Sequence, residues 1–265
     1  MKTVTALALA AAASVAFASP AVADEDRFSV TPYIWLPTVE GDLRFTIPPQ
    51  DPDGPEFFPN VRVGPNDYLE NLEGVFMIAA EARFEPVSVF TDFIYLDFSR
   101  DAARLLSIDR VTPIPPIDIG STSELSGSLW TLAGGYDLID NEDWRLQAFA
   151  GFRYLDVDAD VEWRLSGPLG LFPETGSVSS SSESWDGLVG VRGEARLGDW
   201  FVPYYVDVGG GDSDLTWQGI VGIGYRWGWG DLRLDYRYLS YEQGEENLVR
   251  ELTLGGPAVG ASFRF

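Results

Sequence analysis

Cysteine and histidine are absent from this chain of 265 residues, and its only lysine is Lys2. Without cysteine the chain can form no disulfide and no thiolate nucleophile. Without histidine it can form no serine–histidine couple and no imidazole metal site. A paired-carboxylate site stays formally possible, but no spacing in the sequence singles one out. The sequence therefore predicts that the protein is not an enzyme and has no catalytic residue, metal or cofactor.

Basic residues are also scarce. The chain has 18 Lys and Arg against 41 Asp and Glu, which gives a formal net charge of −23. A nucleic-acid-binding surface needs clustered Lys and Arg to neutralise phosphates, so we expect no nucleic acid partner. Runs of acidic residues are usually solvated, and an acidic surface repels other anions. We therefore expect much of the acidity to lie in long, exposed loops.

Long hydrophobic runs are confined to the beginning of the chain. After Lys2, residues 5–17 are mostly Ala, Leu and Val, and Ala21-Val22-Ala23 is a small-residue cleavage site. We interpret 1–23 as a secretory signal peptide cleaved near Ala23, and 24–265 as a single domain. No other stretch of about 18 apolar residues follows, which excludes a protein that spans a membrane with helices.

The rest of the chain is dominated by alternation of apolar and polar side chains. Segments of about ten residues, rich in Tyr, Trp, Phe, Val and Gly, predict β-strands with one apolar face. The last segment places Val259, Phe263 and Phe265 on one face, and Ser262 and Arg264 on the other. The predicted strands are 28–37, 74–84, 87–98, 125–138, 144–154, 185–197, 201–208, 215–227, 231–240 and 254–265.

The connections indicate how these strands are arranged. Long polar loops and short turns alternate, and aromatic residues concentrate at strand ends, as in a membrane barrel with two interfacial girdles. A soluble sandwich also alternates, but its dry core cannot accept faces that carry Arg233, Asp235 and Arg237. Lipid cannot satisfy an open sheet edge, so the sheet has to close. We predict an all-β fold, a closed antiparallel up-and-down transmembrane β-barrel of about ten strands. Eight or twelve strands stay open because 38–73 is ambiguous.

Long loops are expected at 38–73, 99–123 and 166–184. Within the first, 43–47 and 61–63 could pair above the membrane, and 64–72 could form a short helix because Pro65 suits a first helical position. The alternation that starts at Trp144 continues to Leu165 but changes phase near Tyr154. Such a change of phase indicates a β-bulge.

Several motifs resemble an uncharacterised family of proteobacterial outer-membrane β-barrels. They are PYIWLP at 32–37, DYLENL at 67–72, FTDFIYLD at 90–97, WTLAGGY at 130–136, FRYLD at 152–156, WDG at 185–187, GDSDLTW at 211–217 and YRY at 236–238. The resemblance covers nearly all of 24–265 and implies barrel architecture and location in the cell outer membrane. It implies no activity and no binding residues. The terminal Phe265 also resembles the end of Gram-negative outer-membrane barrels, which implies that the barrel-assembly machinery reads it.

The inward faces of the predicted strands carry many charges. The main candidates for the lumen are Glu81, Arg83, Arg192, Glu194, Arg233, Asp235 and Arg237, and Asp92, Arg145, Arg153, Asp186, Arg196, Arg226 and Arg264 also point inward. A barrel of about ten strands has a narrow interior, so buried charges there should pair and fill it. This predicts a structural or surface role, with a charge-filled lumen and long acidic extracellular loops. The alternative is a narrow passive pore for small ions or solutes, lined by the same charges. Any ligand of these residues stays unknown.

Outside the predicted barrel, Asp156, Asp158, Asp160 and Glu162 fall on one face of an extended arm. They could hold Ca²⁺, or bridge to lipopolysaccharide through divalent ions. A solvated edge that blocks aggregation fits a flat strand face better. Outer-membrane lipid and lipopolysaccharide are the expected partners, besides the assembly machinery.

Overall fold

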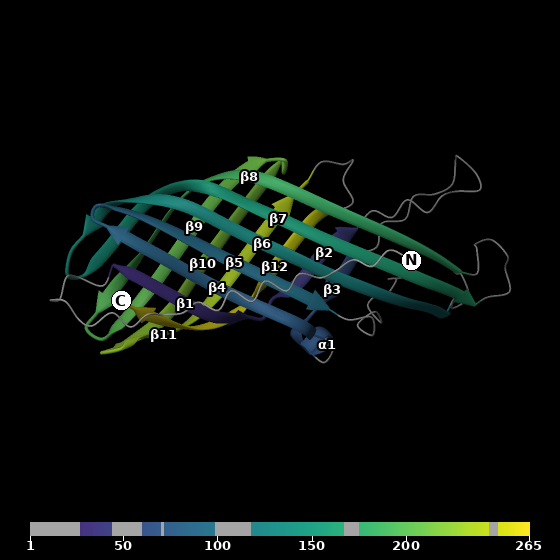
Figure 1. Ribbon diagram of the computed structural model, residues 1–265, viewed down its shortest axis with the longest axis horizontal. Helices are drawn as coiled ribbons and strands as arrows, with labels where there is room; N and C mark the ends of the chain where they lie inside the picture. The colour runs from purple at the N-terminus through teal and green to yellow at the C-terminus, as the bar shows by residue number, and fades with distance from the viewer. Residues whose placement is uncertain (1–26, 44–59, 70–71, 99–117, 167–174, 244–248) are drawn as a thin grey trace, which may run out of the picture.

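A computed structural model describes residues 27–43, 60–69, 72–98, 118–166, 175–243 and 249–265. Its strands form one antiparallel sheet that curls round until β1 (Phe28–Trp35) pairs with β12 (Val249–Arg264), as Figure 1 shows. Ten strands, β1 and β4 to β12, close the barrel. The predicted closed up-and-down barrel of about ten strands is therefore confirmed.

Consecutive strands from β4 to β12 are neighbours in the sheet, so each connection between them stays at one end of the barrel. The remaining elements are β2 Thr38–Leu43, β3 Asn60–Val63, α1 Pro65–Tyr68, β4 Leu72–Phe84, β5 Val87–Phe98, β6 Asp118–Asp140, β7 Trp144–Ser166, β8 Thr175–Leu197, β9 Trp200–Gly211, β10 Leu215–Trp227 and β11 Gly230–Glu242. Short turns at 85–86, 141–143, 198–199 and 228–229 gather at one end with the first residue of β1 and the last of β12; we call this the turn end. The opposite end is the loop end.

The seam between β1 and β12 closes the wall. The backbone N–H of Phe28 donates to the carbonyl of Phe265 at 3.2 Å, and the N–H of Phe265 donates to the carbonyl of Phe28 at 2.9 Å. Inside the seam, the hydroxyls of Thr31 and Ser262 lie 2.7 Å apart. Beyond Trp35 the chain continues along β12 as β2, and β3 pairs with the other edge of β2. On this side the wall therefore extends beyond the end of β1 towards the loop end, because β2 continues the pairing with β12.

The strand bounds agree with the sequence where apolar alternation is strong. β5 and β10 begin and end at the predicted residues. The predicted loops were wrong at 118–123 and 175–184, which are parts of β6 and β8. The cause is β7, which extends to Ser166 and pairs along its length with both neighbours. Because backbone N–H and C=O groups need partners, the long central strand draws polar segments of β6 and β8 into the sheet.

The bulge predicted near Tyr154 is also wrong. Tyr154 pairs in an uninterrupted register with Trp130 and with Trp185, and the register shift between β6 and β7 lies instead between Asp137 and Ile139. The change of phase has a different cause. The outward face of β7 changes from aromatic to acidic after Tyr154, as expected where a wall passes from an apolar surrounding into water.

The first long connection contains both predicted features in altered form. β2 pairs with β3, so the partner of 61–63 is 39–41 rather than 43–47. Helix α1 lies within the predicted 64–72 and starts at Pro65. The predicted signal peptide 1–23 and the loop segments 44–59, 99–117 and 167–174 lie outside the described residues.

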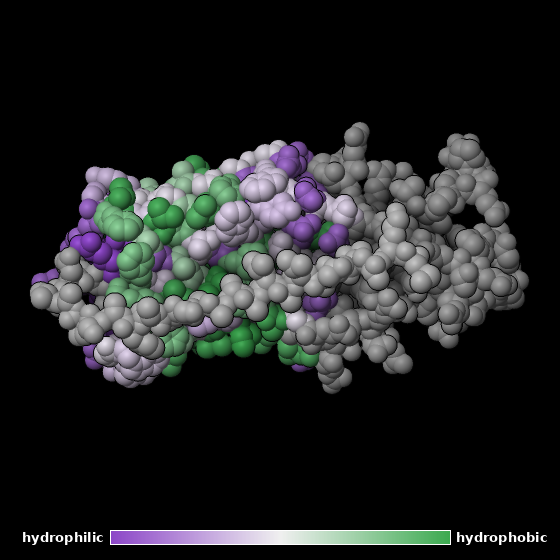
Figure 2. Space-filling view, viewed as in Figure 1, coloured by the Kyte–Doolittle hydropathy of each residue, from purple (hydrophilic) through white to green (hydrophobic). Residues whose placement is uncertain are grey.

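The outward face of the barrel wall is a belt of exposed apolar side chains. Val189, Val221 and Leu234 have 58%, 56% and 55% of their surface exposed. Figure 2 shows hydrophobic residues gathered over the wall, with hydrophilic residues towards the turn end. Among the described residues, no helix has the length and apolar character needed to cross a membrane.

Two rows of aromatic side chains border the apolar belt. Ring contacts nearer the turn end join Phe28, Phe84, Trp200, Tyr225, Trp227, Trp229 and Phe263. Contacts nearer the loop end join Phe76, Phe93, Trp130, Phe152, Tyr154, Trp185, Trp217 and Tyr238. Aromatic rows on both sides of an apolar band are the arrangement of transmembrane barrels.

Candidate functional site

The inward faces of the strands enclose a cavity of about 1220 Å³, which we call the lumen cavity. Nine arginines and seven carboxylates line it. It reaches the turn end, where the exposed Glu85 and Asp140 form part of its rim. Half of the 18 basic residues of the chain therefore meet in one space.

A central group of ion pairs joins β4 to β7 and β8 across this space. Oε1 of Glu81 accepts from Nη2 of Arg145 at 2.9 Å and lies 2.6 Å from Nη2 of Arg192. Nε of Arg145 also donates to Asp137 at 3.1 Å. The guanidinium of Arg192 lies 3.6 Å from the centre of the Phe90 ring. These contacts pair the charges and fix their side chains at the same time.

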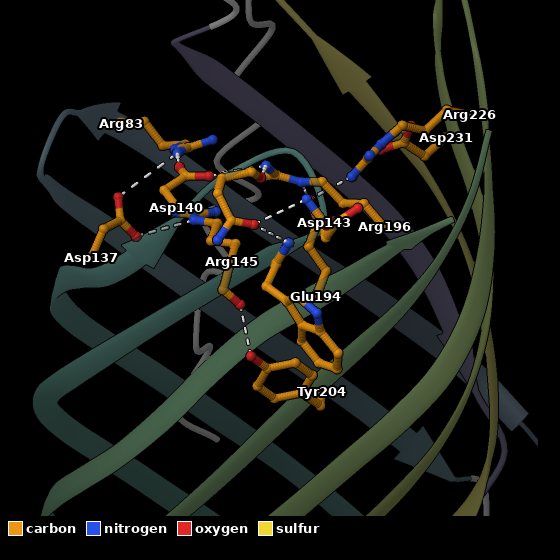
Figure 3. A network of polar contacts seen from close by, with 12 residues as sticks. Arg83, Asp137, Asp140, Asp143, Arg145, Glu194, Arg196, Tyr204, Arg226 and Asp231 are labelled. Carbon is orange, nitrogen blue, oxygen red and sulfur yellow. Dashed lines mark hydrogen bonds and ion pairs between the residues drawn. The ribbon is translucent and has the colours of Figure 1, made fainter. Parts of the chain in front are cut away.

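A second group of ion pairs lies at the rim, and Figure 3 shows it together with Arg145. Asp140 accepts from Arg83 at 2.8 Å and from Arg196 at 2.9 Å. Nε of Arg196 donates to Glu194 at 2.8 Å, and Nη2 of Arg226 lies 2.5 Å from the same carboxylate. The chain of contacts Arg83–Asp140–Arg196–Glu194–Arg226 thus runs round the turn end from β4 to β10.

Arg237 of β11 forms the inner end of the cavity. Its Nη1 lies 2.7 Å from Asp92 and donates to the hydroxyl of Tyr33 at 2.9 Å. Its Nε and Nη2 donate to Oε1 of Gln218 at 3.0 Å and 2.8 Å. The guanidinium also lies 4.8 Å from the centre of the Trp35 ring. Arg237 therefore joins the polar cavity to an apolar layer.

That layer, the apolar plug, consists of inward side chains that are at most 6% exposed: Trp35, Met77, Ile94, Leu129, Leu239, Tyr241 and Ala258. Most of them lie two positions nearer the loop end than a cavity residue on the same strand. Trp35 follows Tyr33 in this way, and Leu239 follows Arg237. On this wall the lumen is therefore polar near the turn end and apolar beyond it.

A buried ion pair completes this layer on the opposite wall. Nη2 of Arg153 donates to Asp207, and both side chains are completely buried. Nη1 of Arg153 donates to Thr216 at 3.1 Å, and its Nε donates to Thr131 at 3.4 Å. The hydroxyl of Tyr205 donates to the same carboxylate oxygen of Asp207 at 2.5 Å. Arg153 thus connects β6, β7, β9 and β10 inside the barrel.

The structure brings the seven main candidates from the sequence together. Glu81, Arg83, Arg192, Glu194, Arg233, Asp235 and Arg237 all line the lumen cavity. Asp92, Arg145, Arg196, Arg226 and Arg264 line it as well, whereas Arg153 and Asp186 do not. Asp186 lies nearer the loop end, where both of its carboxylate oxygens accept hydrogen bonds from Ser213.

Sequence reasoning missed the apolar plug. The inward faces were searched for charged residues, so the apolar side chains in phase with those charges were not considered as a layer. The signal was available, because Trp35 is in phase with the inward Tyr33, and Leu239 and Tyr241 are in phase with Arg237. Asp207, the partner of Arg153, was missed because a single aspartate in an apolar strand gives no sign of its partner.

The described residues contain no group of three or more Asp or Glu side chains arranged to hold a metal ion. Each of the seven cavity carboxylates lies within 3.5 Å of an arginine nitrogen, as expected for a paired charge network.

Comparison with known proteins yields similarity of fold. No protein-family model matches the chain, and no curated protein matches it. The outer membrane protease OmpT from Escherichia coli is 10% identical, with 92% of this chain and 99% of that chain covered and a TM-score of 0.49. The translocator domain of the autotransporter NalP from Neisseria meningitidis is 17% identical, with 91% and 90% covered and a TM-score of 0.41. Neisserial surface protein A is 13% identical, with 90% and 97% covered and a TM-score of 0.35.

These structural neighbours are Gram-negative outer-membrane β-barrel proteins. At such identities and TM-scores they carry no argument about activity, ligand or partner. The barrel itself rests on the strand pairing described above.

Proposed function

We propose that this protein is an integral outer-membrane β-barrel with a sealed lumen and a structural or surface role. The apolar belt between two aromatic rows supports the membrane location, because a wall of this kind would aggregate in water but is solvated by lipid. The pairing of β1 with β12 supports it too, since lipid cannot satisfy an open sheet edge.

The apolar plug is the observation that carries the sealed lumen. A conducting pore needs a continuous water path. Buried apolar side chains on one wall and the buried Arg153–Asp207 pair on the other occupy the lumen between the cavity and the loop end. The lumen cavity is then blind, open at the turn end alone. This favours a structural or surface role over the narrow passive pore.

Planar-bilayer recording of the purified full chain tests this proposal. A sealed barrel should give no stable conductance steps, whatever the salt concentration, when insertion is verified in parallel by resistance to protease. Stable steps whose size rises with salt would overturn the sealed lumen and favour the pore.

The length of the central strands supports a surface role. β6, β7 and β8 have 23 residues each, against 12 or 13 in β5, β9 and β10. A strand of 23 residues is about 75 Å long, whereas crossing a bilayer takes about 9–11 residues. The three strands project together at the loop end in Figure 1. Contact with lipopolysaccharide at the base of this arm is part of the proposal.

The proposal includes no catalytic step, because the chain has neither histidine nor cysteine. It also includes recognition of Phe265 by the barrel-assembly machinery. The ring of Phe265 is 63% exposed beside the seam, so it adds little to packing in the closed barrel. A terminal aromatic residue that contributes little to packing is suited to be recognised by the assembly machinery before the barrel closes.

A further inference from the structure

The lumen cavity exists because one wall of the barrel carries small inward side chains. On β1, β4 and β12 these are Ser29, Thr31, Ala79, Ala258 and Ser262. The rest of the cavity lining includes the larger Phe90, Phe201 and Tyr205. The resulting volume of about 1220 Å³ is at or above the range of small-molecule sites, which is about 300–1,000 Å³. The space is large enough for a small solute with its water.

Two arginines on or beside this wall, Arg233 of β11 and Arg264 of β12, have donors that no described residue accepts from. The Nε of Arg233 donates to Asp235 at 2.6 Å, and no acceptor in the described part of the chain lies within hydrogen-bond distance of its terminal amino groups. Arg264 uses Nη2 alone, on Asp231, within the same described ranges. Their side chains remain 29% and 31% exposed, and that exposed surface faces the cavity.

These two guanidiniums differ from the other arginines of the lumen described above in the number of acceptors that hold them. Arg83 and Arg226 also engage few of their nitrogens, but each lies within 3.9 Å of two or more carboxylates. Arg145, Arg196 and Arg237 each contact two or more acceptors through different nitrogens. Arg233 and Arg264 are instead each fixed by one aspartate and keep donors directed at open space. A guanidinium that is already held in place loses little freedom on binding and matches the planar, bidentate geometry of phosphate and carboxylate groups.

The charge balance of the cavity also favours an anion. Nine arginines and seven carboxylates line it, and Asp137 beside it pairs with Arg145 and Arg83, whereas the whole chain has 41 acidic residues against 18 basic ones. The cavity is thus an electropositive space inside an acidic molecule. Walls of protein on all sides reduce the screening of these charges relative to a surface patch.

We propose that the lumen cavity binds a small soluble oxyanion, a solute bearing phosphate or carboxylate groups, which enters at the turn end and is held by Arg233 and Arg264. In an outer-membrane barrel the turn end faces the periplasm, so the ligand is a periplasmic solute. The site does not depend on the surface role proposed above, and it is compatible with a lumen that conducts nothing.

Isothermal titration of the full chain in a zwitterionic detergent tests the site, with pyrophosphate and citrate as probes and maltose as the neutral comparison. The wild type should bind at least one of the two anions saturably and should not bind maltose. Arg233→Gln should weaken the affinity at least about tenfold, as expected when a charged donor is lost. Arg62→Gln is the matched control, because it removes the same charge from β3, whose backbone pairs with β2 at the loop end, whereas the cavity reaches the turn end.

The proposal is overturned if neither anion binds at millimolar concentration, or if the two variants weaken binding equally. Each variant is titrated after its unheated form is shown to migrate as a folded barrel in gel electrophoresis. If Arg233→Gln does not fold, Arg264→Gln takes its place with the same expected loss. A second arm uses nanodiscs with and without phosphatidylglycerol. Unchanged pyrophosphate affinity supports a soluble ligand, whereas competition by the anionic lipid would assign the site to a headgroup and overturn the soluble one.

Discussion

Arg153 illustrates how a charge is accommodated inside this barrel. Its side chain is fully buried, yet each of its three nitrogens donates a hydrogen bond, to Thr131, Thr216 or Asp207. A buried ion pair is costly to desolvate and stabilises a fold only when its hydrogen bonds are well satisfied. The larger effect arises when one partner is removed, because the other charge then stays buried and unpaired.

We therefore expect Arg153→Met to lower the free energy of unfolding by about 3–5 kcal/mol, since Asp207 would be left without its partner. Urea unfolding of the detergent-solubilised protein, followed by tryptophan fluorescence, measures the loss. Arg196→Met is the matched control at the rim, where the side chains of Arg196 and Asp140 are 21% and 28% exposed. A partly solvated pair of this kind should cost less than about 1 kcal/mol.

Adding Asp207→Leu to Arg153→Met should recover part of the lost stability, because the double variant no longer buries an unpaired charge. Equal costs for Arg153→Met and its control Arg196→Met would contradict this expectation. So would additive effects of Arg153→Met and Asp207→Leu, because additivity means that the two residues are not coupled as the contacts indicate.

At the scale of single residues, the sequence allowed the inward or outward direction of most charged residues to be predicted. The alternation of side chains along a strand is enough to assign Glu81 and Arg83 to one face of β4, and both line the cavity. This alternation could not predict the ion-pair partner of each charged residue. The 2.6 Å contact between Arg192 and Glu81 joins strands that are not neighbours in the sheet, and such contacts depend on the curvature of the barrel.

At the scale of elements, strand bounds were predictable where lipid-like surroundings impose alternation. β5 and β10 were predicted to the residue for this reason. The far halves of β6 and β8 were not, because in water both faces of a strand accept polar residues. The serine-rich segment of β8 is a strand because β7 offers it backbone partners, and its own side chains give no such pattern.

The boundary between these two surroundings can be tested on one face of one strand. Val189 and Glu183 both point outward from β8, but Trp185 of the loop-end aromatic row separates them. Val189→Arg should lower stability by about 2–4 kcal/mol, because it places a charge in the apolar belt. Glu183→Arg should change it by less than about 1 kcal/mol, since the site is near or beyond the interface.

Folding into phosphatidylcholine vesicles across a urea series, read by heat-modifiable gel migration, compares the two β8 variants. Equal effects would show that the exposed valines do not meet lipid, and the membrane orientation proposed here would have to be abandoned.

At the scale of the whole molecule, closure depends on residues at opposite ends of the chain. Phe28 and Phe265 exchange backbone hydrogen bonds, and the hydroxyls of Thr31 and Ser262 meet across a separation of 231 residues. The sequence predicted that the sheet closes, because an open edge is not tolerated in lipid. It left the strand number open, because the roles of β2 and β3 depend on β12 extending past β1.

Phe265→Ala should impair assembly of the barrel in cells while leaving the stability of the closed barrel nearly unchanged. The backbone hydrogen bonds with Phe28 remain, and the lost ring is mostly exposed, so unfolding in detergent should change by less than about 1 kcal/mol. The amount of heat-modifiable protein in the outer-membrane fraction should nevertheless fall several-fold if the assembly machinery reads the ring.

Phe263→Ala is the control for Phe265→Ala, because Phe263 is also outward and aromatic but contacts Trp229, with 5.6 Å between ring centres. It should affect stability more than Phe265→Ala and assembly less. Unchanged outer-membrane levels for Phe265→Ala would refute the proposed reading of the terminus.

The seam between β1 and β12 also limits how such a chain can vary in length. A premature stop codon before β12 removes the strand that pairs with β1, and the sheet is then left with open edges, which hydrocarbon does not tolerate. Since β1 starts and β12 ends at the turn end, strands can be gained or lost only in pairs, as whole hairpins. Viable insertions and deletions of single residues should therefore accumulate in the connections at the loop end, and frameshifts or nonsense mutations should behave as complete losses of the protein.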